Sequence, residues 1–265
     1  MNKETKRVLI CCPIGGQKQY SIVDWFDWIV SQNYSNYEIA VCVNGEGKDE
    51  LAKKFQQTEL RDVHGNEKKI AVLGLNDEGR KYTVIQRLTF SREILRQFAI
   101  EKGFDYLLFL DSDTIPLTMD AIERLISWEK EAVSGVYFYK FSSQPVVIDR
   151  DTATNISLEK LKEGYEGNKL TEVWGFGFGI LLLDVKALTD CAFDYKVFGE
   201  ERSDDFGYCH VLENKGIKRW CDARVICKHL SDESKPNLKN ITPIDFNDKM
   251  HYINDDVKGG VEKLN

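Results

Sequence analysis

Two patterns of apolar and polar positions alternate along the first 110 residues. Short, continuously apolar runs rich in β-branched residues predict buried strands, and they lie at residues 7–13, 37–43, 68–75 and 106–110. Between them, apolar residues recur every three or four positions, as in amphipathic helices. These helical segments are residues 21–33, the lysine-rich stretch after residue 47, and residues 84–101, which Gly103 ends. The alternation predicts a parallel, doubly wound sheet.

The second half of the chain has a more mixed pattern. Helices are expected near residues 155–163, from Ser203 to Gly216, and over about 118–130, with Thr118 as N-cap and Asp120 in the first turn. Apolar runs lie at about residues 132–139, 145–149 and 177–185, and a last strand leads into residue 229.

No repeat or linker is visible, so we expect one α/β domain over residues 1–230. Its sheet is expected to be Rossmann-like, doubly wound and mostly parallel, with helices on both faces and a smaller subsheet from the second half. Residues 231–265 are polar with little periodicity, and we expect a C-terminal tail or flap there.

The composition argues against several classes of protein. The net charge of −7 argues against non-specific nucleic-acid binding, which needs a cationic surface. No run approaches the roughly 20 apolar residues of a membrane-spanning helix. The seven cysteines are odd in number and form no C-x-x-C pair, which favours free buried thiols in a reducing compartment. We therefore expect a cytoplasmic protein without an integral membrane segment; its oligomeric state is not indicated.

Polar loops follow three of the predicted strands. They read "PIGG" at residues 13–16, "NGEG" at 44–47 and "DSD" at 111–113. In open α/β sheets, ligands bind outside the carboxyl ends of the strands. The three loops are therefore expected to converge on one crevice.

The "DSD" segment has three interpretations. Asp111 and Asp113, two residues apart at a strand end, suit a hard divalent cation whose shell is completed by water and substrate phosphates. They could instead be a polar strand end turning toward Pro116, although the apolar strand and the crevice favour the metal. A third interpretation is a haloacid-dehalogenase-type phosphatase with Asp111 as nucleophile. That motif normally follows the first strand of its domain, and here three strands precede it.

Further candidates lie in the second half. Asp204 and Asp205 open a predicted helix, where acids either carry chemistry or simply complement the helix dipole. His229 is either a metal ligand or structural. Trp174 stands before the alternating glycines of "GFGFG", which allow close approach of backbone to a ligand, and a tryptophan face suits a sugar ring. Core packing is the alternative for Trp174.

Taken in order, these segments resemble the GT-A-fold, nucleotide-sugar-dependent glycosyltransferases (family-2-like and DxD-containing) over about residues 7–230. The resemblance is carried by "VLICCPIGG", "YLLFLDSD", "WGFGFGILLLDVKAL", "SDDFGYCHVLENKG" and "DARVICKH". It implies a single GT-A domain with the smaller subsheet on the acceptor side. It also implies sugar transfer from a UDP- or GDP-sugar to a hydroxyl of a glycan, a lipid-linked or another acceptor, with Mn²⁺ or Mg²⁺ as cofactor.

The resemblance also assigns roles to single residues. Asp113 is expected to bind the metal directly, Asp111 the ribose or the metal, and His229 to be a further metal ligand. Asp205 is expected to be the general base, which implies inversion at the sugar carbon, and Asp204 to orient the acceptor or the loop. The other expected donor-binding residues are Pro13, Ile14, Gly15, Asn44, Arg92 and Ser112; those on the acceptor side are Trp174, Gly175 and Gly177.

The chain departs from the family pattern at three places. Asp204 replaces the usual Glu, Asn44 stands in "VNGEG" where an acid is frequent, and Arg92 lies in "SRE" where "R-N" is common. The shorter Asp204 keeps open a catalytically silent sugar- or nucleotide-binding protein. A nucleotidyltransferase is less favoured, because "CPIGGQKQY" lacks the expected spacing of glycines with Arg and Lys.

Overall fold

The computed structural model describes residues 6–76, 80–140, 142–197 and 199–231, together with the short strands β15 (Ile241–Pro243) and β16 (Tyr252–Asn254). The predicted tail or flap therefore falls almost entirely outside the described residues. Within them, no helix combines the length and the apolar character needed to cross a membrane.

The N-terminal half of the central sheet is parallel. It consists of β1 (Val8–Gly15), β2 (Tyr37–Asn44), β5 (Ile70–Gly74) and β6 (Tyr106–Leu110). In it, β1 pairs with both β2 and β6, and β2 pairs with β5. All of β6 and all of β1 before Gly15 are buried. Strands covered on both faces carry no polar alternation, which is why the sequence shows them as continuous apolar runs.

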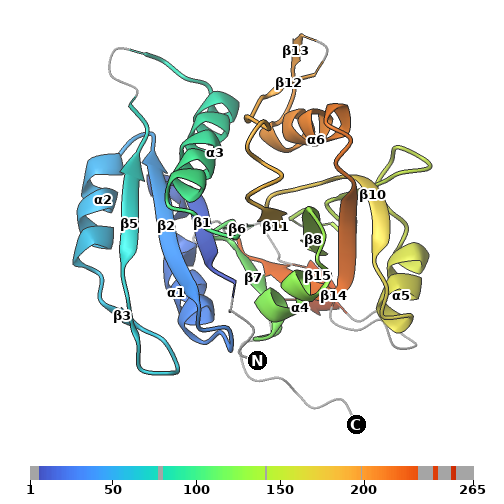
Figure 1. The fold of residues 1–265 in the computed structure, drawn as a ribbon, viewed down its shortest axis with the longest axis horizontal. Helices are drawn as coiled ribbons and strands as arrows, with labels where there is room; N and C mark the ends of the chain where they lie inside the picture. The colour runs from blue at the N-terminus through green and yellow to red at the C-terminus, as the bar shows by residue number, and fades with distance from the viewer. Residues whose placement is uncertain are drawn as a thin grey trace.

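The C-terminal half continues the same sheet with mixed pairing. Its strands are β7 (Thr114–Pro116), β8 (Ala132–Val136), β9 (Val147–Asp149), β10 (Thr171–Phe176), β11 (Ile180–Asp184) and β14 (Arg219–His229). The strand order is β5-β2-β1-β6-β11-β8-β14-β10-β9, with β7 paired to β14 (Figure 1). The predicted subsheet is thus an extension of the main sheet beyond β6.

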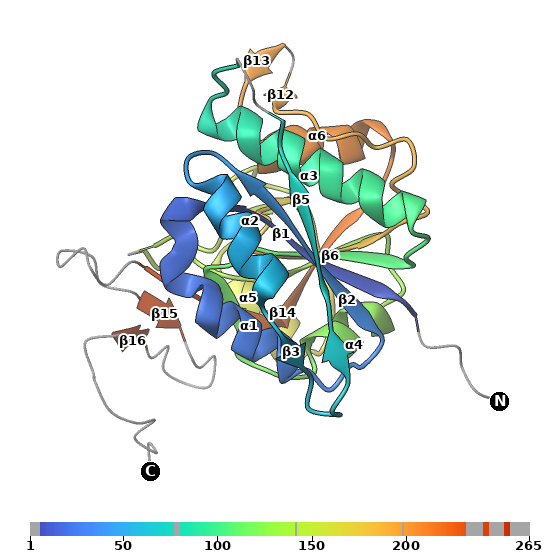
Figure 2. The same cartoon turned by 90° about the vertical axis from the view of Figure 1, so that its left-hand side faces the viewer.

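Helices cover both faces of the sheet, as expected (Figure 2). On one face lie α3 (Val84–Glu101) and α6 (Asp204–Asn214). On the other lie α1 (Ile22–Val30), α2 (Lys48–Gln57) and α4 (Ala121–Ser127). The remaining helix, α5 (Leu158–Glu166), packs against β14. Each face has its own buried apolar cluster.

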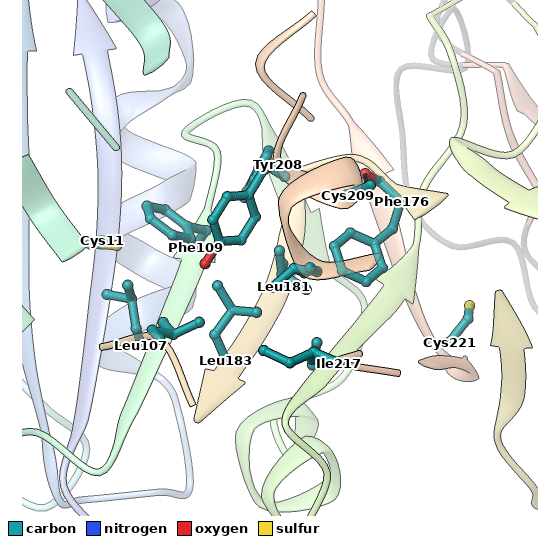
Figure 3. Close-up of a cluster of buried hydrophobic side chains, with 14 of the residues drawn as sticks. Cys11, Leu107, Phe109, Phe176, Leu181, Leu183, Tyr208, Cys209, Ile217 and Cys221 are labelled. Carbon is teal, nitrogen blue, oxygen red and sulfur yellow. Dashed lines mark hydrogen bonds between the residues drawn. The ribbon is translucent and has the colours of Figure 1, made fainter. Parts of the chain in front are cut away.

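The cluster beneath α3 and α6 joins the two halves of the sheet. Figure 3 shows Tyr208 of α6 directed toward Phe109 of β6, with Leu181 and Leu183 of β11 beside them. All four side chains are fully buried. Because β6 and β11 are neighbours, this packing fixes α6 relative to the end of β6, where the "DSD" segment begins. All seven cysteines are buried and unpaired, which confirms the expected free thiols.

Most predicted elements are confirmed, but the start of α4 is not where we expected it. Thr118 is not the N-cap: α4 begins at Ala121, with Asp120 as the N-cap residue. A tertiary contact explains the later start. The chain still runs alongside β14 up to Leu117, whose N–H donates to the carbonyl of Ile226. Short elements were not predicted, among them the 3-10 helix η1 (Gly16–Ser21), the hairpin of β3 (Leu60–Arg61) and β4 (Glu67–Lys68), and the pair β12 (Lys196–Val197) and β13 (Glu200–Glu201).

Candidate active site

A polar cleft lies at the carboxyl ends of β1, β2 and β6, where the three predicted loops meet. It has about 620 Å³ of empty volume, including the part open to solvent, and is lined by Pro13, Gly15, Gln17, Lys18, Asn44, Val84, Arg87, Leu88, Arg92, Asp111, Ser112 and Asp113. An adjoining hollow shares Gly15, Gln17, Asn44 and Arg87 with it. Of the expected donor-binding residues, only Ile14 does not line this cleft, because its side chain is fully buried in the core.

The two acids of the "DSD" turn differ in their exposure to solvent. The N–H of Thr114 donates to the carbonyl of Asp111 (2.9 Å), which closes the turn. Ser112 points inward and its hydroxyl accepts from that of Ser21 (3.2 Å). The side chain of Asp111 is 30% exposed, whereas that of Asp113 is 4% exposed. Asp111 therefore faces the cleft and Asp113 lies beneath its surface.

Asp113 is surrounded by cationic and polar groups that converge on one oxygen, Oδ2. The ammonium groups of Lys18 and Lys140 both donate to it, the latter at 2.6 Å. The Tyr20 hydroxyl lies at 3.1 Å and Nε2 of His229 at 3.6 Å. Burial alone would raise the pKa of Asp113, but His229, Lys18 and Lys140 outweigh it and hold the pKa well below its ordinary value. Asp113 is therefore an anion in this setting.

Arg92 connects the "DSD" turn to the acid pair of α6. The guanidinium, on α3, donates from Nη2 to Asp111 Oδ1 (3.0 Å) and from Nε to Asp204 Oδ2 (2.7 Å). It also lies over the rings of Phe178 and Phe109, 4.2 and 5.3 Å from their centroids. Burial would lower the pKa of Arg92, but the two carboxylates raise it above its ordinary value. Its Nη1 has no hydrogen-bond partner among the described residues.

The two acids of α6 have separate environments. Ser203 is the N-cap residue, as predicted, and its hydroxyl also donates to Asp205 Oδ1. The N–H of Phe206 donates to the same oxygen at 2.8 Å. Burial, and then the neighbouring Asp204, raise the pKa of Asp205 above its ordinary value. Asp204 is therefore paired with Arg92. Asp205 is held only through its Oδ1, which accepts from Ser203 and Phe206.

Asp205 also lines a second, more apolar cavity, which has about 230 Å³ of empty volume including the part open to solvent. The cavity is lined by Tyr139, Val146, Ile148, Trp174, Gly175, Phe176, Gly177, Asp205, Phe206 and Cys209, and so includes all three residues expected on the acceptor side. Trp174 packs against Phe206 with ring centroids 5.7 Å apart. Arg219, fully buried on β14, holds the Trp174 carbonyl from Nε at 2.6 Å. An aromatic wall therefore stands beside a carboxylate of raised pKa.

The glycines of this cavity wall have a packing reason as well. A Cβ on Gly177 would lie 1.9 Å from the hydroxyl oxygen of Tyr137 and 2.8 Å from a methyl of Val146. A Cβ on Gly175 would lie 3.3 Å from Cys209 Sγ. The buried ring of Tyr137 thus requires glycine at position 177 whether or not a ligand approaches it.

His229 reaches Asp113 because β14 pairs with β7, which aligns His229 with Thr114. Nδ1 of His229 lies 2.8 Å from the carbonyl of Phe138. A carbonyl only accepts, so Nδ1 carries a proton and Nε2 is the ring nitrogen that faces Asp113. When unprotonated, Nε2 could ligate a cation bound between it and Asp113 Oδ2. An imidazole nitrogen beside carboxylate oxygens suits Mn²⁺ in particular.

Asp113 and His229 therefore fit a divalent cation, but they do not form a complete shell. Among the described residues, no three His, Cys, Asp or Glu side chains are grouped closely enough to hold a metal ion. Asp111, the third expected ligand, directs one oxygen to Arg92. The remaining ligands would have to be water and the phosphates of a substrate.

Sequence reasoning missed several residues of the site. Lys18 and Tyr20 lie in "GGQKQY" directly after β1, and this position was a signal that could have identified them. Arg87 lies one turn into α3 and faces Gly45 across the cleft. Lys140 reaches Asp113 from the segment after β8, and nothing local in the sequence indicates that contact.

Comparison with solved structures shows which fold this is. The chain is similar to the mannosyltransferase PcManGT from Pyrobaculum calidifontis, solved with GDP-Man and Mn²⁺ (13% identity, TM-score 0.55, 85% of this chain and 57% of that one). It is also similar to GalNAc-T7, solved with UDP, GalNAc and Mn²⁺ (12% identity, TM-score 0.57, 87% and 45%). A third similar structure is A197 from STIV (18% identity, TM-score 0.50, 89% and 90%).

These similarities establish the GT-A fold over most of the chain. The chain spans about half the length of the first two of these structures and nearly all of A197. No protein-family model and no curated protein sequence matches the chain.

Proposed function

We propose that this protein is a glycosyltransferase that moves a sugar from a UDP- or GDP-sugar to an acceptor hydroxyl. The observation that carries the proposal is the bridge made by Arg92. It pairs with Asp111 in the polar cleft and with Asp204, the neighbour of Asp205 in the aromatic cavity. A donor in the cleft and an acceptor in the cavity would meet at this bridge.

The cleft suits the nucleoside diphosphate. Its lining combines cationic side chains, which favour phosphates, with backbone from the loops after β1 and β2, which can contact a base. The Asn44 amide donates to the Ser91 hydroxyl (3.3 Å), which orients the side chain within the cleft. Asp111, the more exposed acid of the "DSD" turn, would accept a hydrogen bond from a ribose hydroxyl.

The aromatic cavity suits the acceptor, since apolar ring faces pack well against aromatic side chains. There Asp205 would take the proton of the attacking hydroxyl. Its Oδ1 is already held by Ser203 and Phe206, which leaves Oδ2 for the acceptor. A raised pKa makes the carboxylate a stronger base once it is ionised. Attack from this side, opposite the diphosphate, would invert the configuration at the sugar carbon.

A metal ion would be held by Asp113 and His229, with Asp111 able to join through its second oxygen. When bound, Mn²⁺ or Mg²⁺ would supply positive charge to the two phosphates of the leaving group. Arg92 would contribute to the same end by keeping Asp111 in a fixed position.

The first test is a thermal-shift screen of UDP, GDP and their sugars, with and without Mn²⁺, on wild type and Asp113→Ala. One nucleotide class at 100 times its Kd should add about 2.7 kcal/mol and raise Tm by roughly 5–10 °C. The Mn²⁺-dependent part of this shift should vanish in Asp113→Ala.

Asp205→Asn separates an enzyme from a silent binder. It should bind the nucleotide as wild type does and lose about 10²–10⁴-fold in transfer or donor hydrolysis, the range for a general base. Donor binding by wild type without any turnover would favour the silent binder. Hydrolysis of simple phosphomonoesters, with phosphate on Asp111, would favour the phosphatase instead.

A further inference from the structure

Two ammonium groups share a single carboxylate oxygen in the site. Lys18 and Lys140 both donate to Oδ2 of Asp113, although they come from η1 and from the segment after β8. Lys140 also lies 3.0 Å from the hydroxyl of Tyr20, which itself contacts Asp113. One carboxylate neutralises one ammonium, so the cluster has an excess of positive charge.

The cluster stands where a divalent cation would bind. The oxygen that the lysines use is the one that Nε2 of His229 faces at 3.6 Å. A cation between Asp113 and His229 would therefore lie against two ammonium groups and be repelled by them. The lysine side chains are 40% and 26% exposed, so their flexible ends have room to move away from Asp113.

The cleft gives the direction in which Lys18 would move, and Lys140 lies beside Lys18 because both bind the same oxygen of Asp113. Lys18 lines it together with Asp113 and Arg92. An ammonium is a compact charge with three donors and binds phosphate well. A dianionic diphosphate in the cleft would offer both lysines more negative charge than the single carboxylate they share.

We propose that Lys18 and Lys140 are ligands of the donor diphosphate and that they occupy the cation position on Asp113 when no nucleotide is bound. This inference rests on the proposed function. The lysines and a divalent cation then compete for Asp113 in the empty site, and both act on the diphosphate in the loaded one. Nucleotide binding consequently persists without metal.

The test measures two affinities in Lys18→Met, Lys140→Met and the double variant. Mn²⁺ alone, titrated by electron paramagnetic resonance, should bind several-fold more tightly to the double variant than to wild type. The nucleoside diphosphate selected by the thermal-shift screen, titrated calorimetrically in EDTA, should bind at least tenfold more weakly. Lys18→Arg and Lys140→Arg keep the charge and should retain most of the nucleotide affinity.

Lys162→Met is the matched control, because Lys162 is 40% exposed on α5 and pairs with Glu166 away from the cleft. It should leave both affinities unchanged. A purely structural role would weaken both affinities together, and this result, or two unchanged affinities, would overturn the inference alone. A wild type that binds no nucleoside diphosphate would overturn the proposed function, and the inference with it.

Discussion

Arg92 shows how much of the site depends on one side chain. A guanidinium has five donors in a rigid fork, so it can serve carboxylates on two different elements, which a lysine cannot do with the same geometry. Asp204 was expected to orient the acceptor or the loop. In the structure its partner is Arg92, so a side chain shorter than glutamate is sufficient at that position.

Replacing Arg92 with Met should therefore destabilise the fold as well as the site. It leaves Asp111 and Asp204 as largely buried carboxylates without their counterion. We expect a loss of about 3 kcal/mol in the free energy of unfolding, the lower end for broken buried pairs, because Asp111 is 30% exposed. Urea unfolding at neutral pH measures it. Arg202→Met is the control, because the Arg202 side chain is 59% exposed in its pair with Glu200. Equal losses in the two variants would contradict this expectation.

The protonation of Asp205 should set the acid limb of the pH–rate profile. A general base works only when ionised, and a raised pKa keeps it protonated up to a higher pH. We therefore expect kcat/KM to fall on acidification at a pH above that of an ordinary aspartate. Ser203→Ala removes a hydrogen bond that favours the ionised form, so its acid limb should move to still higher pH. A shift toward lower pH in this variant would show that Asp205 is not the group being titrated.

At the scale of elements, the sequence predicts those helices and strands that have a clear local pattern of apolar and polar residues. The four strands of the parallel half were predicted from continuous apolar runs, and helix α3 from its apolar periodicity. Gly103 and Gly216, both with positive φ, follow α3 and α6 as predicted. The start of α4 was misplaced because the pairing of β7 with β14 joins residues more than 100 positions apart. Lys140 was not predicted as a site residue for the same reason, since its contact with Asp113 exists only once the sheet has formed.

The wall of the aromatic cavity gives a prediction at this scale. Gly177→Ala places a methyl group against Tyr137 and Val146, and such overpacking typically costs about 1–3 kcal/mol. Gly175→Ala meets only Cys209 at 3.3 Å and should cost less. Chemical unfolding of both variants, and of Gly177→Ala combined with Tyr137→Phe, measures the difference. The double variant should recover part of the loss, and no recovery would mean that the hydroxyl is not the obstacle.

At the scale of the whole molecule, the two halves of the sheet have different tasks. The parallel half ends in the polar cleft proposed for the donor, and the mixed half carries the aromatic cavity proposed for the acceptor. Arg92 on α3 and Asp204 on α6 tie the halves together above the core shared by β6 and β11. The division into halves could be anticipated from the change in hydrophobic pattern near residue 110. The tie between them could not, because it joins residues 112 positions apart.

The seven buried thiols are distributed over both halves. Cys11, Cys12 and Cys42 lie in β1 and β2, and Cys221 and Cys227 lie in β14. Burial raises the pKa of Cys42 to about 11 and that of Cys221 to about 12, so neither forms the reactive thiolate while the sheet is closed. Each of these five thiols therefore becomes reactive toward an alkylating reagent only when its own strand is exposed. Timed alkylation, followed by measurement of peptide masses, would tell whether the parallel half and the mixed half of the sheet open together or one before the other.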